Sequence, residues 1–249
     1  MSDRILAWVS GGAASIVAAK RAISRYGDRV ELVRCETGNE DEDNHRFERD
    51  CEAWLGRKVT ILRAERFDSV WEVWQKRRYI SGVNGAACTT HMKVEPRLAF
   101  QRPTDTHVFG YTADANDITR FAKLQETYFE LTVEAPLIDA HMTKASVLQM
   151  VENAGLRLPR SYAMGFPNAN CLGTGCAKAQ SPAYWSLYRH HFPDRFARTA
   201  AFSRDLGVRM VRIKGERRFL DELPADWPML DPIVPSCDFL CQIAEQEIE

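Results

Sequence analysis

The sequence has no apolar run that approaches the roughly 18 residues a membrane-spanning helix needs, so no membrane segment is expected. A signal peptide is missing too, because Met1–Arg4 leads directly into an apolar stretch that reads as a strand. The cytoplasm is therefore the expected compartment. Internal repeats and low-complexity tracts are also absent, which indicates a globular chain of 249 residues.

A strong net charge is lacking as well, because 33 Lys and Arg stand against 34 Asp and Glu. A surface that is basic overall is excluded, so tRNA or DNA would have to bind a local patch. Basic residues with intervening aromatics occur at 76–78, 189–198 and 214–218. Such a patch fits a nucleic-acid backbone, and a solvated face over an aromatic core is an equal alternative.

The cysteines do not form the even-numbered framework of a small secreted protein, because there are seven of them. In a reducing compartment an odd, clustered set indicates metal binding or catalysis rather than disulfides. Two close pairs stand out, Cys171 with Cys176 and Cys237 with Cys241. Together they suit a four-thiolate site that ties the tail to the core, with unligated reduced thiols as the alternative.

An apolar run near the N-terminus stops abruptly at Ser10-Gly11-Gly12, and a helical pattern begins near Ala14. This succession predicts a buried strand, a tight glycine turn and a helix start. Free N–H groups of the first helical turn and the helix dipole favour an anion there, with phosphate as the best candidate. A plain strand-to-helix turn explains this stretch equally well.

The alternation of strand and helix patterns predicts βαβ units and a doubly wound parallel sheet, which is an α/β fold. Expected strands cover 5–9, 30–35, 59–62, 106–109 and 208–213, with an extended piece at 134–139 and a loop at 80–90. Expected helices cover 14–26, 44–55 with Asn44 as cap, 69–77, a stretch from about 91, 117–128, 143–154, 183–191 and 194–206. We expect a nucleotide-binding domain at 1–157 and a helical, cysteine-bearing extension at 158–249.

Four segments resemble the phosphoadenylyl-sulfate (PAPS) reductase branch of the PP-loop ATP pyrophosphatase superfamily, whose fold is adenine nucleotide alpha hydrolase-like. They are Ser10-Gly11-Gly12-Ala13-Ala14-Ser15, Glu36-Thr37-Gly38-Asn39-Glu40, the stretch from Cys88 through Lys93-Val94-Glu95-Pro96, and Gly110 to Asp114 with Arg120. The later stretch from Asn168 to Trp185, with a cysteine pair at the tail, resembles reductase-like proteins of phages and bacteria.

The resemblance implies an adenine nucleotide, either ATP or a sulfonucleotide, in a crevice at the carboxyl ends of the strands. The phosphates of this nucleotide would bind Ser10, Gly11, Gly12, Ala13 and Ser15. Its adenosine would lie near Thr37 and Gly38. The residues that bind its phosphate or sulfate group would be Lys93, Arg97 and Arg120, with Asp114 beside them. For Lys93 and Arg97 the alternative is a solvated helix face. A Mg²⁺ contact at the acidic run 40–43 is left open beside a solvated helix start.

A 4Fe–4S cluster is typical of the reductase and thiolation branches, and zinc is the alternative at Cys171, Cys176, Cys237 and Cys241. Cys88 is interpreted as a cluster ligand, a nucleophile or a buried structural thiol, in that order. Cys35 and Cys51 are expected in the core.

The resemblance implies an enzyme that transfers sulfur or reduces a sulfonucleotide, and Cys88 and Lys93 are its candidate catalytic residues. Two departures matter. Ala13-Ala14 replaces the Lys-Asp of ATP-cleaving members, and the tail lacks the Glu-Cys-Gly-Leu/Thr-His motif of true reductases. ATP-dependent thiolation of a nucleic acid or small molecule is one alternative. A non-catalytic nucleotide-binding protein with structural zinc is another, and the oligomeric state is left open.

Overall fold

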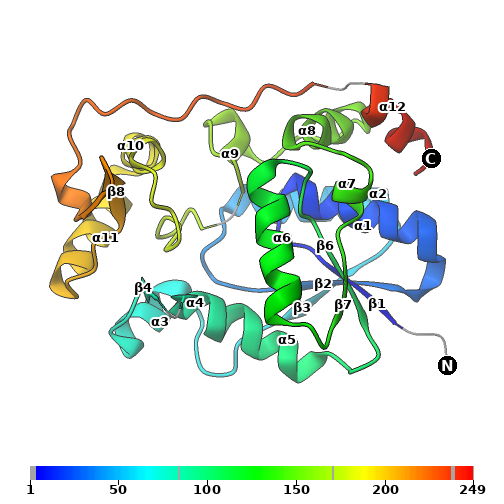
Figure 1. The fold of residues 1–249 in the computed structure, drawn as a ribbon, viewed down its shortest axis with the longest axis horizontal. Helices are drawn as coiled ribbons and strands as arrows, with labels where there is room; N and C mark the ends of the chain where they lie inside the picture. The colour runs from blue at the N-terminus through cyan, green and yellow to red at the C-terminus, as the bar shows by residue number, and fades with distance from the viewer. Residues whose placement is uncertain (1–3, 84, 170, 237–238, 249) are drawn as a thin grey trace.

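The computed structural model describes residues 4–83, 85–169, 171–236 and 239–248, and only the backbone of residues 239–241. At its centre lies a five-stranded parallel sheet in the order β3-β2-β1-β6-β7, which confirms the α/β prediction (Figure 1). Its strands are β1 (Ile5–Trp8), β2 (Val30–Cys35), β3 (Val59–Leu62), β6 (Thr106–Phe109) and β7 (Thr132–Glu134). Two short antiparallel pairs join β4 (Ser81–Gly82) to β5 (Gly85–Ala86) and β8 (Val211–Ile213) to β9 (Glu216–Arg218).

Helices cover both faces of the large sheet, as a doubly wound fold requires. On one face lie α1 (Ala13–Tyr26), α2 (Glu42–Leu55) and α8 (Lys144–Asn153), and on the other lie α5 (Glu95–Phe100) and α6 (Ala115–Thr127). The remaining helices are α3 (Val70–Arg77), α4 (Ala87–Thr89), α7 (Pro136–Asp139), α9 (Arg160–Ala163), α10 (Pro182–His191), α11 (Pro193–Asp205) and α12 (Phe239–Gln246). Among the described residues, no helix combines the length and hydrophobicity that crossing a membrane requires.

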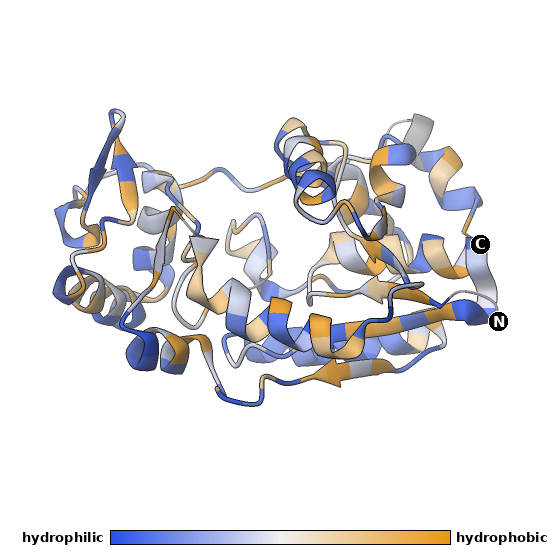
Figure 2. Ribbon diagram, turned by 60° about the horizontal axis from the view of Figure 1, so that its bottom comes forward, coloured by the Kyte–Doolittle hydropathy of each residue, from blue (hydrophilic) through white to orange (hydrophobic). Residues whose placement is uncertain are grey.

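Two hydrophobic cores hold the molecule together. The first lies between the sheet and α1, α2 and α8, and the second joins residues 67–92 to residues 166–223 (Figure 2). The chain then runs back across the molecule, and α12 packs against α8, placing Ala244 and Ile248 in the first core (Figure 1). Each core therefore draws on residues from both sides of the expected boundary at 157/158, and that boundary stays a prediction.

Three local expectations were wrong. Residues 136–139, expected to be extended, form α7, because Pro136 suits the first turn of a helix. Asn44 lies inside α2, and the N-cap is Asp41, whose carboxylate accepts the N–H of Asp43. The end of the expected loop at 80–90 is helical, because α4, a π-helical turn at 90–94 and α5 run on without a break.

Arg4, just before β1, forms ion pairs with residues in or next to the neighbouring strands β2 and β6. Its guanidinium donates to both oxygens of the buried Asp105 carboxylate at 3.1 and 2.7 Å, and to Glu31 at 3.1 Å. Burial raises the pKa of Asp105, but the hydrogen bonds from Arg4 and the Arg102 N–H outweigh it and hold that pKa below its ordinary value. The ionised Asp105 therefore stabilises the fold above its unfolded pKa of about 3.9, and the stabilisation is lost as pH falls through the folded pKa.

We expect Asp105→Asn to lower the free energy of unfolding at pH 7 by about 1–3 kcal/mol, because a charge-assisted pair becomes a neutral one. The difference from the wild type should shrink as pH falls below about 4. Denaturant unfolding of both proteins at several pH values measures this. A difference that stays constant with pH would contradict the assigned role of the Asp105 charge.

Candidate functional site

The turn between β1 and α1 has the geometry expected of an anion cradle. Gly11 adopts φ +74°, a conformation that glycine tolerates best, and Gly12 is the N-cap of α1. The Ser15 hydroxyl accepts the N–H of Ser10 at 3.0 Å and donates to the Gly12 carbonyl at 2.9 Å. Gly110, at the end of β6, approaches so closely that a Cβ there would lie 2.6 Å from the Ser15 nitrogen. The expected phosphate segment is thus closely surrounded by backbone.

The loop after β2 lies beside this turn and is rigidly bonded. Glu40 accepts the hydroxyl of Thr37 at 2.6 Å and its N–H at 3.2 Å. A Cβ on Gly38 would lie 2.2 Å from the Asp68 carbonyl oxygen, so only glycine fits there. A small cavity of about 10 Å³ lies between Gly11, Arg34, Glu40 and the first turns of α2. Glu40 therefore connects the loop of Thr37 to the cavity beside Gly11, and the roles of Thr37 and Gly38 toward a nucleotide stay predictions.

The loop that carries Cys171 and Cys176 packs directly on the residues that follow β2. Gly173 donates its N–H to the Asn39 carbonyl at 3.0 Å, and the Asn39 amide donates to the Thr174 hydroxyl at 2.9 Å. A Cβ on Gly173 would lie 2.3 Å from the Asn39 side-chain oxygen. The cysteine loop therefore borders the expected nucleotide crevice.

Cys171 and Cys176 contact each other through their sulfur atoms. Hydrogen bonding to Cys176 and burial raise the pKa of Cys171, whereas the hydrogen bond from Cys171 lowers the pKa of Cys176 to about 6. Backbone N–H groups of Lys178 and Ala179 also stabilise the Cys176 thiolate. Cys171 holds a left-handed φ of +65°, which is uncommon for a residue with a side chain and is typical of functional sites.

Cys88 and Lys93 face the same pair. Burial raises the pKa of Cys88, and the Lys93 charge opposes that shift. Burial lowers the pKa of Lys93, but the sulfurs of Cys171 and Cys88, together with Glu40, outweigh it, so that its pKa is raised. The structure thus brings together three cysteines and one lysine that lie up to 88 positions apart in the sequence.

The proposed metal ligands are only partly covered by the structure. Cys237 and the side chain of Cys241 lie outside the described residues. Before them, the Ser236 N–H donates to the Ala145 carbonyl, near the start of α8, at 3.2 Å. The neighbouring Lys144 ammonium donates to the Pro167 carbonyl, just before the cysteine loop. Within the described part of the chain, no three Cys, His, Asp or Glu side chains form a group that would hold a single metal ion.

Lys93 and Arg97 are not part of a solvated helix face. They are four residues apart in the helical stretch, and Arg97 is only 7% exposed. Its guanidinium lies 4.3 Å above the Tyr128 ring, and its Nε and Nη2 have no hydrogen-bond partner among the described residues. Neither cation is within ion-pair distance of a carboxylate in the part of the chain that the structure describes. A buried guanidinium without an acidic partner, as at Arg97, is costly unless an anion pairs with it.

The segment after β6 is occupied by internal contacts. Asp114 accepts the Thr112 hydroxyl at 2.6 Å and the Lys144 N–H at 2.8 Å. The Arg120 side chain is 66% exposed and pairs with Asp117 at 2.7 Å. The roles of Asp114 and Arg120 toward a nucleotide stay predictions.

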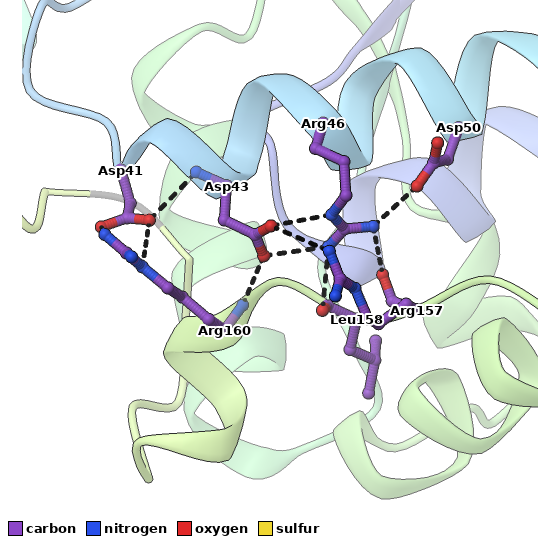
Figure 3. A network of polar contacts seen from close by, with 7 residues as sticks. All are labelled: Asp41, Asp43, Arg46, Asp50, Arg157, Leu158 and Arg160. Atoms are coloured by element: carbon purple, nitrogen blue, oxygen red, sulfur yellow. Dashed lines mark hydrogen bonds and ion pairs between the residues drawn. The ribbon is translucent and has the colours of Figure 1, made fainter.

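The acidic run at 40–43 is not a solvated helix start. Asp41 is buried and pairs with Arg160 at 2.7 Å, and Asp43 pairs with Arg46 at 2.7 Å (Figure 3). Of the core expectations, Cys51 is confirmed as buried, whereas Cys35 is half-buried with its thiol 3.6 Å from the Lys93 carbonyl oxygen.

Several arginines of the predicted basic patch are engaged in contacts within the protein. Arg189 and Arg195 donate to backbone carbonyls, and Arg78 pairs with Asp205 at 2.7 Å. Arg198 lies 3.6 Å above the Trp71 ring. Segment 158–222 nevertheless carries eleven Lys and Arg against five Asp and Glu, although the whole chain is nearly neutral.

Sequence reasoning missed Tyr162, whose hydroxyl accepts the Ala13 N–H at 3.1 Å, and Arg34, which is buried among Glu36, Glu40 and Glu48. An arginine inside an apolar strand was the one available signal for Arg34. Nothing in the local pattern around Tyr162 indicates a contact with a residue 149 positions away.

The sequence matches no protein-family model and no curated protein. Among solved structures the chain is similar to PAPS reductase from Candida auris in its phosphate complex, with 14% identity, a TM-score of 0.48 and coverage of 66% of this chain and 78% of that one. It is also similar to the U34-tRNA thiolase NcsA from Methanococcus maripaludis with its [4Fe-4S] cluster, with 10% identity, a TM-score of 0.44 and coverage of 98% and 81%. The parallel sheet itself, with its order and its helices on both faces, remains the basis for the fold assignment.

Proposed function

We propose that this chain is an enzyme that binds an adenine nucleotide in the crevice at the carboxyl ends of β1, β2 and β6 and uses it in sulfur transfer or sulfonucleotide reduction. One observation carries the proposal. Arg97 is buried and Lys93 is half-buried, neither forms an ion pair with a carboxylate among the described residues, and Lys93 faces Cys88, Cys171 and Cys176. An anionic group and reactive sulfur would meet at this point.

The nucleotide would be held mainly by backbone. The α1 N-terminus offers N–H groups and a favourable dipole to a phosphate, and neither requires the Lys-Asp that Ala13 and Ala14 replace. Arg97 offers unpartnered N–H groups in a planar fork, which suits two oxygens of a phosphate or sulfonate. Lys93 would add a point charge on the side of the cysteines.

We propose that Cys171 and Cys176, with the tail pair Cys237 and Cys241, hold a 4Fe–4S cluster, with zinc as the alternative. The donor chemistry suits the group, because Cys176 is held as a thiolate by neighbouring N–H groups and by Cys171. When bound, such a cluster would supply one-electron chemistry and iron sites with affinity for sulfur. Cys88 then remains as the free thiol beside Lys93.

In the reductase reaction, the Cys88 thiol would lose its proton to solvent, with Lys93 favouring the thiolate, and its sulfur would attack the sulfonate sulfur while the S–O bond to the nucleotide phosphate breaks. The nucleotide leaves with the electron pair, and Lys93 would neutralise charge on the sulfonate oxygens. A second thiol then displaces sulfite and forms a disulfide with Cys88, so that two thiols supply the two electrons. A dithiol reductant would restore both.

A second candidate is thiolation of a nucleic acid, favoured by the excess of six positive charges over 158–222, the segment that carries the cysteine loop. There ATP would adenylate a base oxygen with loss of pyrophosphate, and a sulfur nucleophile would displace AMP.

The two candidates release different products. Anaerobically purified protein should release sulfite from a sulfonucleotide in the presence of dithiol, or pyrophosphate from ATP in the presence of bulk tRNA or DNA. Sulfite supports reduction, and nucleic-acid-dependent pyrophosphate supports thiolation. Nucleotide binding with neither product, in a colourless protein with stoichiometric zinc, would contradict both and favour a binding protein.

A further inference from the structure

The backbone N–H at the start of α1 already has a partner in this structure. Ala13, the first residue of the helix, donates its N–H to the Tyr162 hydroxyl at 3.1 Å. This N–H belongs to the group that a phosphate would need, since the proposed nucleotide site lies on the same turn.

The helix that carries Tyr162, α9, is held by a network of ion pairs and hydrogen bonds around Arg160 (Figure 3). The Arg160 guanidinium pairs with Asp41 at 2.7 Å, and the Arg160 N–H donates to Asp43 at 2.8 Å. Arg46 donates to the carbonyls of residues 157 and 158 at 2.9 and 3.1 Å. These contacts fix the short helix α9 to the start of α2 and thereby position Tyr162.

We propose that the Tyr162 hydroxyl occupies the phosphate position at the α1 N-terminus in the nucleotide-free protein, and that a nucleotide phosphate displaces it on binding. The inference rests on the proposed nucleotide site. One N–H is best aligned to a single acceptor, so the hydroxyl and a phosphate oxygen compete for Ala13. The phosphate prevails when bound, because a charged acceptor forms a stronger hydrogen bond and interacts favourably with the helix dipole.

The hydroxyl is suited to this exchange because it is neutral. Burial raises the pKa of Tyr162 to about 12, so the group remains protonated at physiological pH and its departure separates no charges. Its oxygen accepts one hydrogen bond from Ala13, which leaves the ring to pack against the first core whether or not the bond is made. Tyr162 is therefore a positioning residue that sets the affinity for the nucleotide.

The test is the affinity of the full-length protein for ATP, measured by calorimetry. Tyr162→Phe keeps the ring but leaves Ala13 without an acceptor in the free protein, so ATP should bind about 2- to 10-fold more tightly. Tyr26→Phe is the matched control, because Tyr26 donates to Glu134 at the opposite end of the same helix. Its affinity for ATP should equal that of the wild type.

A second variant tests the same contact independently. Arg160→Ala removes the ion pair with Asp41 that holds α9, so this variant should also bind ATP more tightly. Combined with Tyr162→Phe, the Arg160→Ala substitution should add little further affinity, because both substitutions act through the Tyr162 hydroxyl. Amide hydrogen exchange gives a readout that does not depend on affinity. The Ala13 N–H should exchange faster in Tyr162→Phe than in the wild type, and ATP should protect it in both.

The outcomes separate the two proposals. Equal or weaker ATP binding by Tyr162→Phe, with binding by the wild type intact, would overturn the displacement and leave the nucleotide site standing. An affinity gain that is the same in Tyr26→Phe would also overturn it. Failure of all these proteins to bind ATP or a sulfonucleotide would overturn the proposed function and the displacement together.

Discussion

Replacing Cys176 with serine is expected to abolish iron binding. Cys176 contacts Cys171, and the hydrogen bond from Cys171 and neighbouring backbone N–H groups lower the pKa of Cys176, which favours its thiolate. Thiolates are the ligands that iron–sulfur clusters require, and a serine hydroxyl at this buried position keeps its proton. Iron and acid-labile sulfide content of anaerobically purified protein, with its visible absorbance, measures the loss.

Cys51→Ser is the control for this experiment. Cys51 is 1% exposed in the first core, and burial raises its pKa, so it is an inert thiol. That variant should keep the wild-type iron content even if it is less stable. Full iron content in Cys176→Ser would contradict the proposed cluster site.

The same measurement settles which thiols complete the ligand set. Cys241→Ser should lose iron, and Cys88→Ser should keep its iron but lose turnover. The reverse pattern, with iron lost from Cys88→Ser and kept in Cys241→Ser, would make Cys88 a ligand and remove the tail from the site. Zinc in place of iron in the wild type would contradict the cluster and favour the structural alternative.

Much of the fold could be predicted because its signals are local. The apolar runs that form β1, β2, β3 and β6 are short and bounded by turn residues, β1, β2 and β6 are largely buried, and the helices between the strands are amphipathic. The errors also have local causes. The apolar residues after Pro136 suit an extended piece, but the fixed φ of Pro136 also suits a helix start; Asn44 is a suitable cap residue, but Asp41 precedes it and caps the helix.

The site was predictable where backbone geometry decides and less so where tertiary packing does. Ser10 to Gly12 and Gly38 stand out in the sequence because tight turns require particular residues, and Gly11 and Gly38 do adopt positive φ, whereas their contact with a nucleotide stays a prediction. By contrast, no pattern reveals that Arg97 loses its solvent and lies against Tyr128, or that Cys88 comes to face Cys171 and Cys176. Contacts between residues about 30 to 150 positions apart depend on how whole elements pack, and single-residue chemistry does not encode that.

Lys93→Met is expected to lower kcat/KM by about 10²- to 10³-fold, for sulfite release or for pyrophosphate release, whichever reaction the enzyme performs. Removing one charge-stabilising donor from an active site has an effect of this size. Lys93 faces both the cysteine group and Glu40. Methionine has similar length and no charge, so it removes the electrostatic contribution and retains most of the packing.

Two further variants separate the contribution of the Lys93 charge to kcat/KM from that of its side-chain packing. Lys93→Arg keeps the charge and should recover part of the activity, although its planar fork is bulkier. Lys123→Met on the exposed side of α6 removes a lysine away from the site and should leave kcat/KM unchanged. Because burying Lys93 desolvates an ammonium group, its loss should not destabilise the fold as the loss of a well-packed apolar residue would. A Lys93→Met protein that is active but unstable would therefore assign Lys93 to the structure instead of the reaction.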